Sequence, residues 1–330
     1  MESMNLFGKN SEERNDGLVH YQGELGDFWY DPNEFEVLTH ERAKFWYDPK
    51  ESVLTAHEKV EFEYLHYVGN NGAVDLPKGC TNTRYMFWDC ELPEGFQLIA
   101  FNTSNVEVME HMFYRCRIPT GFSLGDEFST SNVIDMSWMF AGCKISTGFT
   151  LGHKFDTSKV RTMEGMFYGC GFPEKFTLGD NFNTINVEAM DYMFCGCKFP
   201  HDFSFGNNFN TENTGGFRGM FASCMFPEGF SLGNKFSIAN GYLHPYPDDP
   251  KLASYIVVTA EGMFAYSTVL GDFDLGESFK AESFTTRSKD LFSNCILPEG
   301  AKQSQFHTDS AIIKWLKARH LDKINQKQDQ

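Results

Sequence analysis

The chain has 330 residues, of which 41% are hydrophobic and 22% charged, a composition typical of a folded protein and not of a disordered one. Its formal net charge of −17 argues against direct binding of nucleic acid, because Lys and Arg side chains drive phosphate binding. Phenylalanine is over-represented, with 34 copies against 13 Tyr and 5 Trp, which indicates that Phe fills one structural position many times.

The N-terminal part differs from the rest of the sequence. Residues 1–17 are polar and charged, and we expect a flexible N-terminus without a secretory signal. Residues 18–79 contain a duplication, since Phe28–Pro32 and Phe45–Pro49 both read Phe-Trp-Tyr-Asp-Pro and both continue into Val-Leu-Thr. This pattern predicts strand, turn and strand. We expect a β-rich N-terminal cap over 18–79, with a separate binding module as the alternative.

Residues 80–300 repeat a unit of about 27 residues. The unit reads G-F-x-L-G-x-x-F-x-T-x-N-V-x-x-M-x-x-M-F-x-x-C, and its last Phe recurs at spacings of 26, 27, 27, 27, 27, 43 and 28. The Phe and the residue three positions later are Phe87 and Cys90, Phe113 and Cys116, Phe140 and Cys143, Phe167 and Cys170, Phe194 and Cys197, Phe221 and Cys224, Phe264 and Ser267, and Phe292 and Cys295.

Each unit is predicted to contain two elements. Between Val133 and Cys143 the apolar residues recur at helical spacing, which predicts a short helical segment. Phe149-Thr150-Leu151 alternates apolar and polar residues, which predicts a short strand, and Gly152 then lets the chain turn. Because one such unit cannot bury its apolar side alone, we predict a leucine-rich-repeat-like solenoid with one short parallel strand and one short helical segment per turn.

The spacing of 43 contains an insertion at residues 241–256, which is rich in Tyr and Pro. We expect it to leave the repeat as a stiff contact loop. Residues 301–330 form the C-terminal helix and tail, in which Asp309 or Ser310 can cap a helix that runs to about Ile324. This helix should cover the end of the repeats, although its basic face could instead touch an acidic partner.

The residue types that often carry chemistry have simpler explanations here. Seven of the nine Cys recur at one repeat position, which is typical of core residues in a reducing compartment rather than of disulfides or metal ligands. The ten His share no register with Cys or with paired carboxylates, and no phosphate-binding loop is present, so we expect no cofactor and no enzymatic activity. A Thr in each turn resembles an ice-binding ladder, but hydrogen bonding to the helix start and between turns explains it better.

The most informative set is aromatic. On a helix that begins near Met136, Trp138 would face outward, and Tyr85, His111 and Tyr192 occupy the same repeat position. A row of exposed aromatic side chains is unusual on a surface that meets only water, although mutual packing between turns is an alternative. The predicted partner-binding residues are Tyr85, Trp88, His111, Tyr114, Trp138, Tyr168 and Tyr192, together with Tyr242, His244, Tyr246, Asp248 and Asp249 of the insertion.

The repeat resembles a known family. Phe101-Asn-Thr-Ser-Asn-Val106, followed by Met109, Met112-Phe113 and Cys116, is similar to the repeats of BspA-like bacterial leucine-rich-repeat proteins. The resemblance covers about residues 76–300. It implies a leucine-rich-repeat-like solenoid that binds other proteins, often host or surface proteins.

We therefore expect a non-enzymatic scaffold that presents an aromatic helix face and an inserted loop to another protein. The alternative is an acidic mimic of nucleic acid that inhibits a DNA- or RNA-binding protein. No stretch approaches the roughly 20 apolar residues of a membrane helix. We expect a cytoplasmic protein that does not contact a membrane or bind nucleic acid directly.

Overall fold

The computed structural model describes the backbone of six strands within residues 11–56, and residues 81–92, 98, 101–238, 260–279, 290–301, 305–306 and 308–328. The chain forms two compact units, Met1–Phe155 and Asp156–Gln330. The insertion at 241–256, with Tyr242, His244, Tyr246, Asp248 and Asp249, lies outside the described residues.

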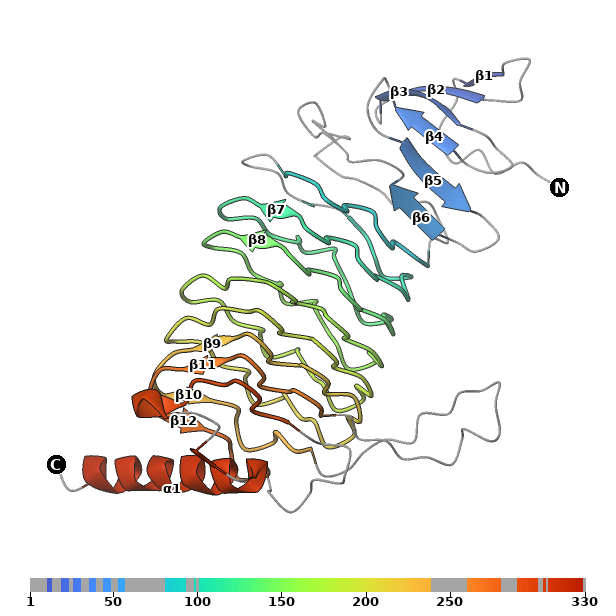
Figure 1. The fold of residues 1–330 in the computed structure, drawn as a ribbon. Helices are drawn as coiled ribbons and strands as arrows, with labels where there is room; N and C mark the ends of the chain where they lie inside the picture. The colour runs from blue at the N-terminus through green and yellow to red at the C-terminus, as the bar shows by residue number, and fades with distance from the viewer. Residues whose placement is uncertain are drawn as a thin grey trace, which may run out of the picture. The chain divides into compact units, whose positions relative to one another are not determined.

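The N-terminal strands form one antiparallel sheet in which each strand pairs with the next along the chain (Figure 1). The duplicated sequence forms the hairpins β3–β4 and β5–β6, which confirms the predicted strand–turn–strand pattern. β1 lies within residues 1–17, the segment expected to be a flexible N-terminus. The strands are β1 (Ser11–Glu13), β2 (Val19–Gly23), β3 (Gly26–Tyr30), β4 (Glu36–Thr39), β5 (Lys44–Asp48) and β6 (Val53–Ala56).

In the first unit, successive turns of the repeat lie parallel and in register. Strand β7 (Arg117–Ile118) pairs with β8 (Lys144–Ile145), and isolated bridges join other positions of the same turns. The repeated Phe side chains are buried and stack, with 5.0 Å between the ring centroids of Phe87 and Phe113 and 5.3 Å between those of Phe113 and Phe140. The Phe excess is therefore explained by a column of rings, as predicted.

The second unit repeats this arrangement across the irregular spacing. Phe221 and Phe264 are 43 residues apart, yet their rings stack at 5.5 Å. The insertion therefore interrupts the sequence without breaking the register. Two parallel pairs join the same turns, namely β9 with β11 and β10 with β12, where the strands are β9 (Met225–Phe226), β10 (Phe230–Ser231), β11 (Thr268–Val269) and β12 (Phe273–Asp274).

The predicted helical segment in each turn is wrong. Between Met136 and Cys143 the backbone instead makes consecutive tight turns, with hydrogen bonds from Met139 N to Met136 O (3.2 Å), from Ala141 N to Trp138 O (3.1 Å) and from Cys143 N to Phe140 O (3.1 Å). Trp138 has a φ of +59°, which a right-handed helix excludes.

The other amides of these segments bond to the next turn of the repeat. In the first unit His111 N donates to Ser137 O at 2.9 Å and Phe113 N donates to Met139 O at 2.8 Å. Every second N–H therefore serves a neighbouring turn, and an α-helix cannot form. The apolar spacing resembles a helix because tandem turns also direct every third or fourth side chain inward.

The predicted strand is correct only in part. The Phe-x-Leu segment contributes β10 and β12, but at Phe149–Leu151 the described strand pairing is a single bridge between Ser123 and Thr150. The two-residue strands β7, β8, β9 and β11 instead begin directly after the repeat's Cys or Ser267. Sequence alternation missed them because each strand has only two residues, of which at most one is buried.

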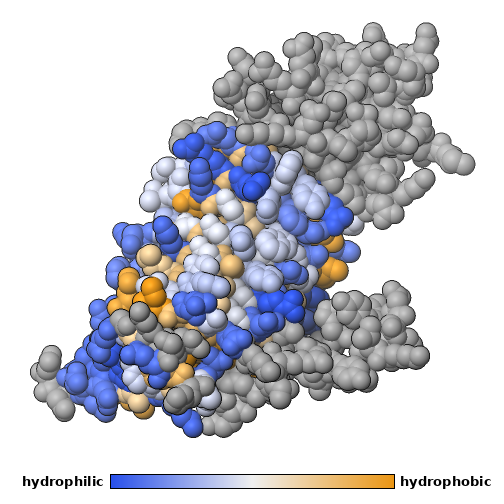
Figure 2. Space-filling view, viewed as in Figure 1, coloured by the Kyte–Doolittle hydropathy of each residue, from blue (hydrophilic) through white to orange (hydrophobic). Residues whose placement is uncertain are grey.

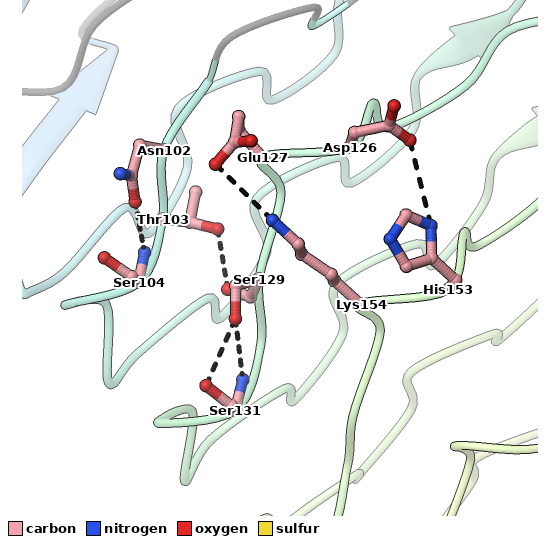
Figure 3. A network of polar contacts seen from close by, with 9 residues as sticks. All are labelled: Asn102, Thr103, Ser104, Asp126, Glu127, Ser129, Ser131, His153 and Lys154. Carbon is pink, nitrogen blue, oxygen red and sulfur yellow. Dashed lines mark hydrogen bonds and ion pairs between the residues drawn. The ribbon is translucent and has the colours of Figure 1, made fainter.

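The threonine ladder joins neighbouring turns. In Figure 3 the hydroxyl of buried Thr103 donates to the carbonyl oxygen of Ser129 at 2.6 Å. In the second unit Thr157 and Thr184 make the same bond to Asn183 and Asn210, both at 2.8 Å. These Thr side chains are buried, which confirms hydrogen bonding between turns as their structural role.

The predicted C-terminal helix is present as α1 (Asp309–Gln328), which follows the short helix η3 (Pro298–Gly300). Ile312, Ile313 and Leu316 are its buried residues. Asp309 accepts hydrogen bonds from Leu291 N (3.1 Å) and Phe292 N (3.5 Å). For Phe292 N, the carboxylate thus takes the place of the carbonyl group that a further turn would supply. Among the described helices, none is long and apolar enough to cross a membrane.

The basic side of α1 contacts the repeats of its own unit. Arg319 Nη1 lies 2.7 Å from Glu299 Oε1, and Lys323 Nζ lies 2.9 Å from Glu228 Oε1. His320 Nδ1 lies 3.0 Å from Asp272 Oδ2. These contacts explain why the tail is basic, and they favour the predicted capping role over contact with an acidic partner.

Candidate partner-binding surface

In each turn, the segment from the first repeat Met position to the repeat Cys contains two positions with a left-handed backbone. The first, two residues after the first repeat Met, is here called the first left-handed column. In the first unit it holds the aromatic residues Tyr85 (φ +59°), His111 (+56°) and Trp138 (+59°). In the second unit it holds Gly165, Tyr192, Gly219, Gly262 and Asp290.

This conformation costs a bulky residue about 1–2 kcal/mol relative to glycine, because Cβ crowds the following carbonyl oxygen. The repeat uses Gly at Gly165, Gly219 and Gly262, so the backbone does not require an aromatic residue here. Side chains that occupy four such positions despite this cost must be stabilised by contacts or retained for function.

Contacts between turns provide part of that stabilisation. The rings of Tyr85 and His111 stack with their centroids 4.8 Å apart, and those of His111 and Trp138 stack at 6.1 Å. Aromatic pairs of this kind contribute about 0.5–1.5 kcal/mol beyond their burial. The three residues are half-buried, so the fully outward orientation expected from a helix is wrong, and the mutual packing named as the alternative occurs in the first unit.

Tyr192 in the second unit makes a different contact. Its ring lies over Gly219, where an added Cβ would come within 2.8 Å of both Cδ1 and Cε1. The first left-handed column thus holds rings that stack on rings in the first unit, and a ring that lies on glycine in the second. In both units the aromatic side chain leaves part of its surface exposed.

The flanking aromatic residues extend this surface. Tyr114 lies against His111 with 5.1 Å between ring centroids, and the Arg115 guanidinium lies 5.6 Å from the centre of the Tyr114 ring. Trp88 and Tyr114 are half-buried, and Tyr168 is 41% exposed. Of the predicted site residues, Tyr85, His111, Tyr114 and Trp138 therefore form one continuous cluster.

A charged pair lies beside the stack. Arg84 donates to Glu110, which raises the pKa of the Arg84 guanidinium, and His111 Nδ1 lies 3.3 Å from Glu110 Oε1 without hydrogen-bond geometry. Burial lowers the pKa of His111 more strongly than Glu110 raises it. The stack therefore favours a neutral imidazole.

This shift predicts a pH dependence centred on the stack. A histidine whose pKa is lowered in the folded state stabilises the fold above its ordinary pKa of 6.5, and that contribution is lost as the pH falls through the lowered value. We expect urea unfolding midpoints of the wild type to fall between pH 7.5 and 5.5 relative to His111→Phe, which keeps the ring and cannot titrate. If the urea midpoints of the two proteins changed in parallel with pH, the lowered pKa of His111 would be contradicted.

The cysteine column forms part of the core. The thiols of Cys116, Cys143, Cys224 and Cys197 donate to the carbonyl oxygen of a Phe in the preceding turn, at 2.6, 2.8, 2.9 and 3.0 Å. Burial raises the pKa of Cys116, Cys197 and Cys224, and that of Cys295 to about 12. The eight described Cys are free and seven are buried, so these thiols pack as predicted.

Because these thiols are buried and protonated, we expect the melting temperature to be the same with and without reductant. Differential scanning calorimetry in the presence and absence of dithiothreitol measures this directly. A drop on reduction would mean that disulfides form in solution and that the core assignment of the Cys column is incorrect.

Within the described ranges no group of three His, Cys, Asp or Glu side chains is placed to hold a metal ion. Sequence reasoning also missed a second surface, the exposed apolar residues Met225, Tyr266, Leu270 and Ile296 of the second unit. A comparison of each repeat position across all turns would have found them, because other turns place polar, charged or small residues at the positions of Met225, Ile296 and Tyr266 and mostly Pro at that of Leu270.

The repeats match one family model, in two overlapping segments at residues 81–173 and 135–230. The family is described as a Mycoplasma protein of unknown function, DUF285. Comparison with curated proteins and with solved structures gave no match. A match in overlapping segments is consistent with a repeat family.

Proposed function

We propose that this chain is a non-enzymatic scaffold that binds another protein through the first left-handed column and its flanking aromatic residues. One observation carries the proposal: Tyr85, His111, Trp138 and Tyr192 occupy a strained backbone position where three other turns use glycine. Aromatic side chains held rigidly and partly exposed are the usual anchors of protein interfaces, because they bury a large area at little entropic cost.

We also infer that the repeats stack as a solenoid of the leucine-rich-repeat type, as in the BspA-like bacterial proteins. The parallel register within each unit and the recurring Phe, Thr and Cys positions support this inference. Repeat stacks of this kind expose long surfaces and rarely enclose a pocket, which favours binding over catalysis.

The acidic mimic of nucleic acid has less support. Several exposed acids pair with bases of a neighbouring turn, including Glu91 with Arg117 at 2.9 Å and Glu127 with Lys154 at 3.5 Å (Figure 3). The position after the strand Gly carries Asp126 and Asp180 but also His153, Asn207 and Asn234. A regular row of charges, as on a phosphate backbone, is therefore interrupted.

Trp138→Gly tests the proposal at its centre. Glycine occurs at the same column position in other turns and accepts a positive φ, so the variant should fold. We expect the proteins that cross-link to the wild type in native lysate to be lost from Trp138→Gly, with unchanged far-UV circular dichroism. Asp126→Lys, whose side chain is 88% exposed in the wild type, is the control and should bind normally.

The opposite result would support the acidic mimic. If Asp126→Lys together with Asp180→Lys abolished cross-linking while Trp138→Gly did not, charge rather than aromatic contact would carry recognition. Steep weakening of binding by added salt would accompany that result. Retention of the same partners by all variants would place the binding surface elsewhere.

The insertion is tested by deleting residues 241–256. The turns on either side already contact each other through Phe221 and Phe264, so the shortened chain should fold with the same circular dichroism per residue. We expect it to lose the cross-linked partner, since the insertion carries predicted contact residues. Equal binding by the deleted chain would show that the loop is only a tolerated insertion.

A further inference from the structure

Four large apolar side chains lie exposed on one face of the second unit. Met225 is 45% exposed, Tyr266 67%, Leu270 58% and Ile296 54%, and we call these four residues the apolar face. In Figure 2 hydrophobic surface gathers at the side where Figure 1 draws β9 and β11.

Backbone register shows that these residues are neighbours. Thr268 of β11 pairs with Met225 of β9 and with Ile296, so these three positions form one row across the strands. Tyr266 and Leu270 lie two residues before and after Thr268, just beyond the two ends of strand β11, and both are exposed. Fully extended backbone from Tyr266 to Leu270 would span about 13 Å and three neighbouring strands about 10 Å, so the apolar face is at most about this size.

The apolar face is not what the repeat itself requires. At the position of Met225 and Ile296, other turns carry Arg117, Lys144 and Lys198. At the position of Tyr266, the adjoining turns carry Ser223 and Asn294. Tyr266 also has a φ of +60°, a strained conformation that Asn adopts more readily. Strain and exposure of an aromatic side chain together indicate a function at this site rather than packing.

The backbone limits what can bind there. The N–H groups of Tyr266, Thr268 and Leu270 already donate to neighbouring turns, at 2.8, 2.9 and 3.1 Å. An extended peptide lying on this face would find none of these amides free, and its own polar groups would be buried without partners. A helix satisfies its own backbone, and its apolar stripe covers about 10 Å in seven residues, which matches the apolar face.

Charged residues at the border of the apolar face favour one sign of charge on the bound helix. Glu228 and Glu299 lie at equivalent positions just beyond it and are paired with Lys323 and Arg319 of α1. Lys198 pairs in register with Met225, is exposed, and forms no ion pair within the described part of the chain. A carboxylate on the bound helix would complement it. α1 shows the same kind of contact in reverse, since its apolar residues are buried while its bases meet acids of the repeats.

We propose that the apolar face binds an amphipathic helix of another protein, with an apolar stripe over Tyr266, Met225, Leu270 and Ile296 and an acidic residue against Lys198. This surface lies within the second unit and is independent of the aromatic cluster in the first. A second copy of the chain is a less suitable occupant, because two molecules each carrying −17 repel one another.

The test uses a fluorescein-labelled, lactam-stapled 16-residue peptide with Leu at i, i+3, i+4 and i+7 and Glu beside the stripe. Fluorescence anisotropy with the full chain should show saturable binding. Tyr266→Asn combined with Leu270→Ser should weaken the binding at least tenfold. Both replacement residues occur at the equivalent positions of other turns, as Asn294 and Ser146. Leu321→Ser, on an equally exposed apolar residue outside the face, is the matched control and should bind normally.

A charge-reversal variant and a measurement of self-association complete the test. Lys198→Glu should reverse the preference between the Glu peptide and a Lys-substituted peptide. Trp138→Gly should leave peptide binding unchanged. The role of the apolar face is thus tested separately from the proposed function of the aromatic cluster. Equal binding by the double variant and the wild type, or no binding by either, overturns the proposal. Self-association of the wild type in sedimentation velocity, abolished by the double variant, would overturn it in favour of a second copy.

Discussion

Phe221→Ala is expected to lower the free energy of unfolding by about 3–5 kcal/mol, the usual cost of removing a fully buried ring. Phe221 is 0% exposed and stacks with Phe194 at 5.6 Å and with Phe264 at 5.5 Å. It therefore joins the turns on both sides of the insertion. Its loss would leave a cavity at the place where the sequence is least continuous.

Urea denaturation followed by circular dichroism measures this loss, and hydrogen exchange shows where it acts. The amides of the turns next to Phe221 should exchange faster in the variant. Leu321→Ala, at a residue that is 57% exposed, should change stability by less than about 0.5 kcal/mol. A loss under about 1 kcal/mol for Phe221→Ala would show that the ring column does not hold these turns together.

Gly276→Ala is expected to be almost as damaging, for a steric reason. Gly276 has a φ of +78°, and an added Cβ would lie 2.1 Å from the carbonyl oxygen of Gly233 in the preceding turn. Since the contact is with backbone, no side-chain rotation relieves it. Overpacking and the left-handed conformation together should cost about 2–5 kcal/mol.

Gly233→Ala is a matched control for this prediction. Gly233 holds the same repeat position with a φ of +80°, but an added Cβ there meets no atom within 4 Å. It should cost only the conformational part, about 1–2 kcal/mol. Thermal unfolding of the two variants side by side separates crowding from backbone strain. Equal losses would mean that the close approach of Gly276 to Gly233 relaxes without penalty.

Much of the architecture could be predicted because it depends on residues that recur. The register of Phe87 with Phe113, the buried Cys column and the helix from Asp309 all follow from local patterns that contacts in the fold reinforce. The strands of the duplicated segment from Phe28 could be predicted because β-branched and aromatic residues lie on either side of an Asp-Pro sequence.

The tandem turns could not be predicted in the same way. In the sequence from Val106 to Cys116 the apolar spacing fits a helix equally well, and what excludes the helix is the donation of every second amide to another turn. That partner lies about 26 residues away, beyond any local pattern. Trp138 carries no sequence signal for a positive φ, because bulky residues rarely adopt one.

The candidate site was predicted in composition rather than in geometry. The aromatic identity of Tyr85, His111 and Trp138 is evident in the sequence, but their stacking depends on the left-handed backbone. The apolar face was missed for the opposite reason, since single residues such as Tyr266 and Leu270 look unremarkable until their register is known.

The bonding of alternate amides to the next turn makes the turns interchangeable modules. Within each unit the same main-chain groups, the same buried Thr hydroxyl and the same Phe ring join one turn to the next, whatever the outward side chains are. Duplication or loss of a whole turn therefore leaves matching surfaces on both sides. Such a chain can change its length in steps of one repeat while its exposed residues diverge independently, turn by turn.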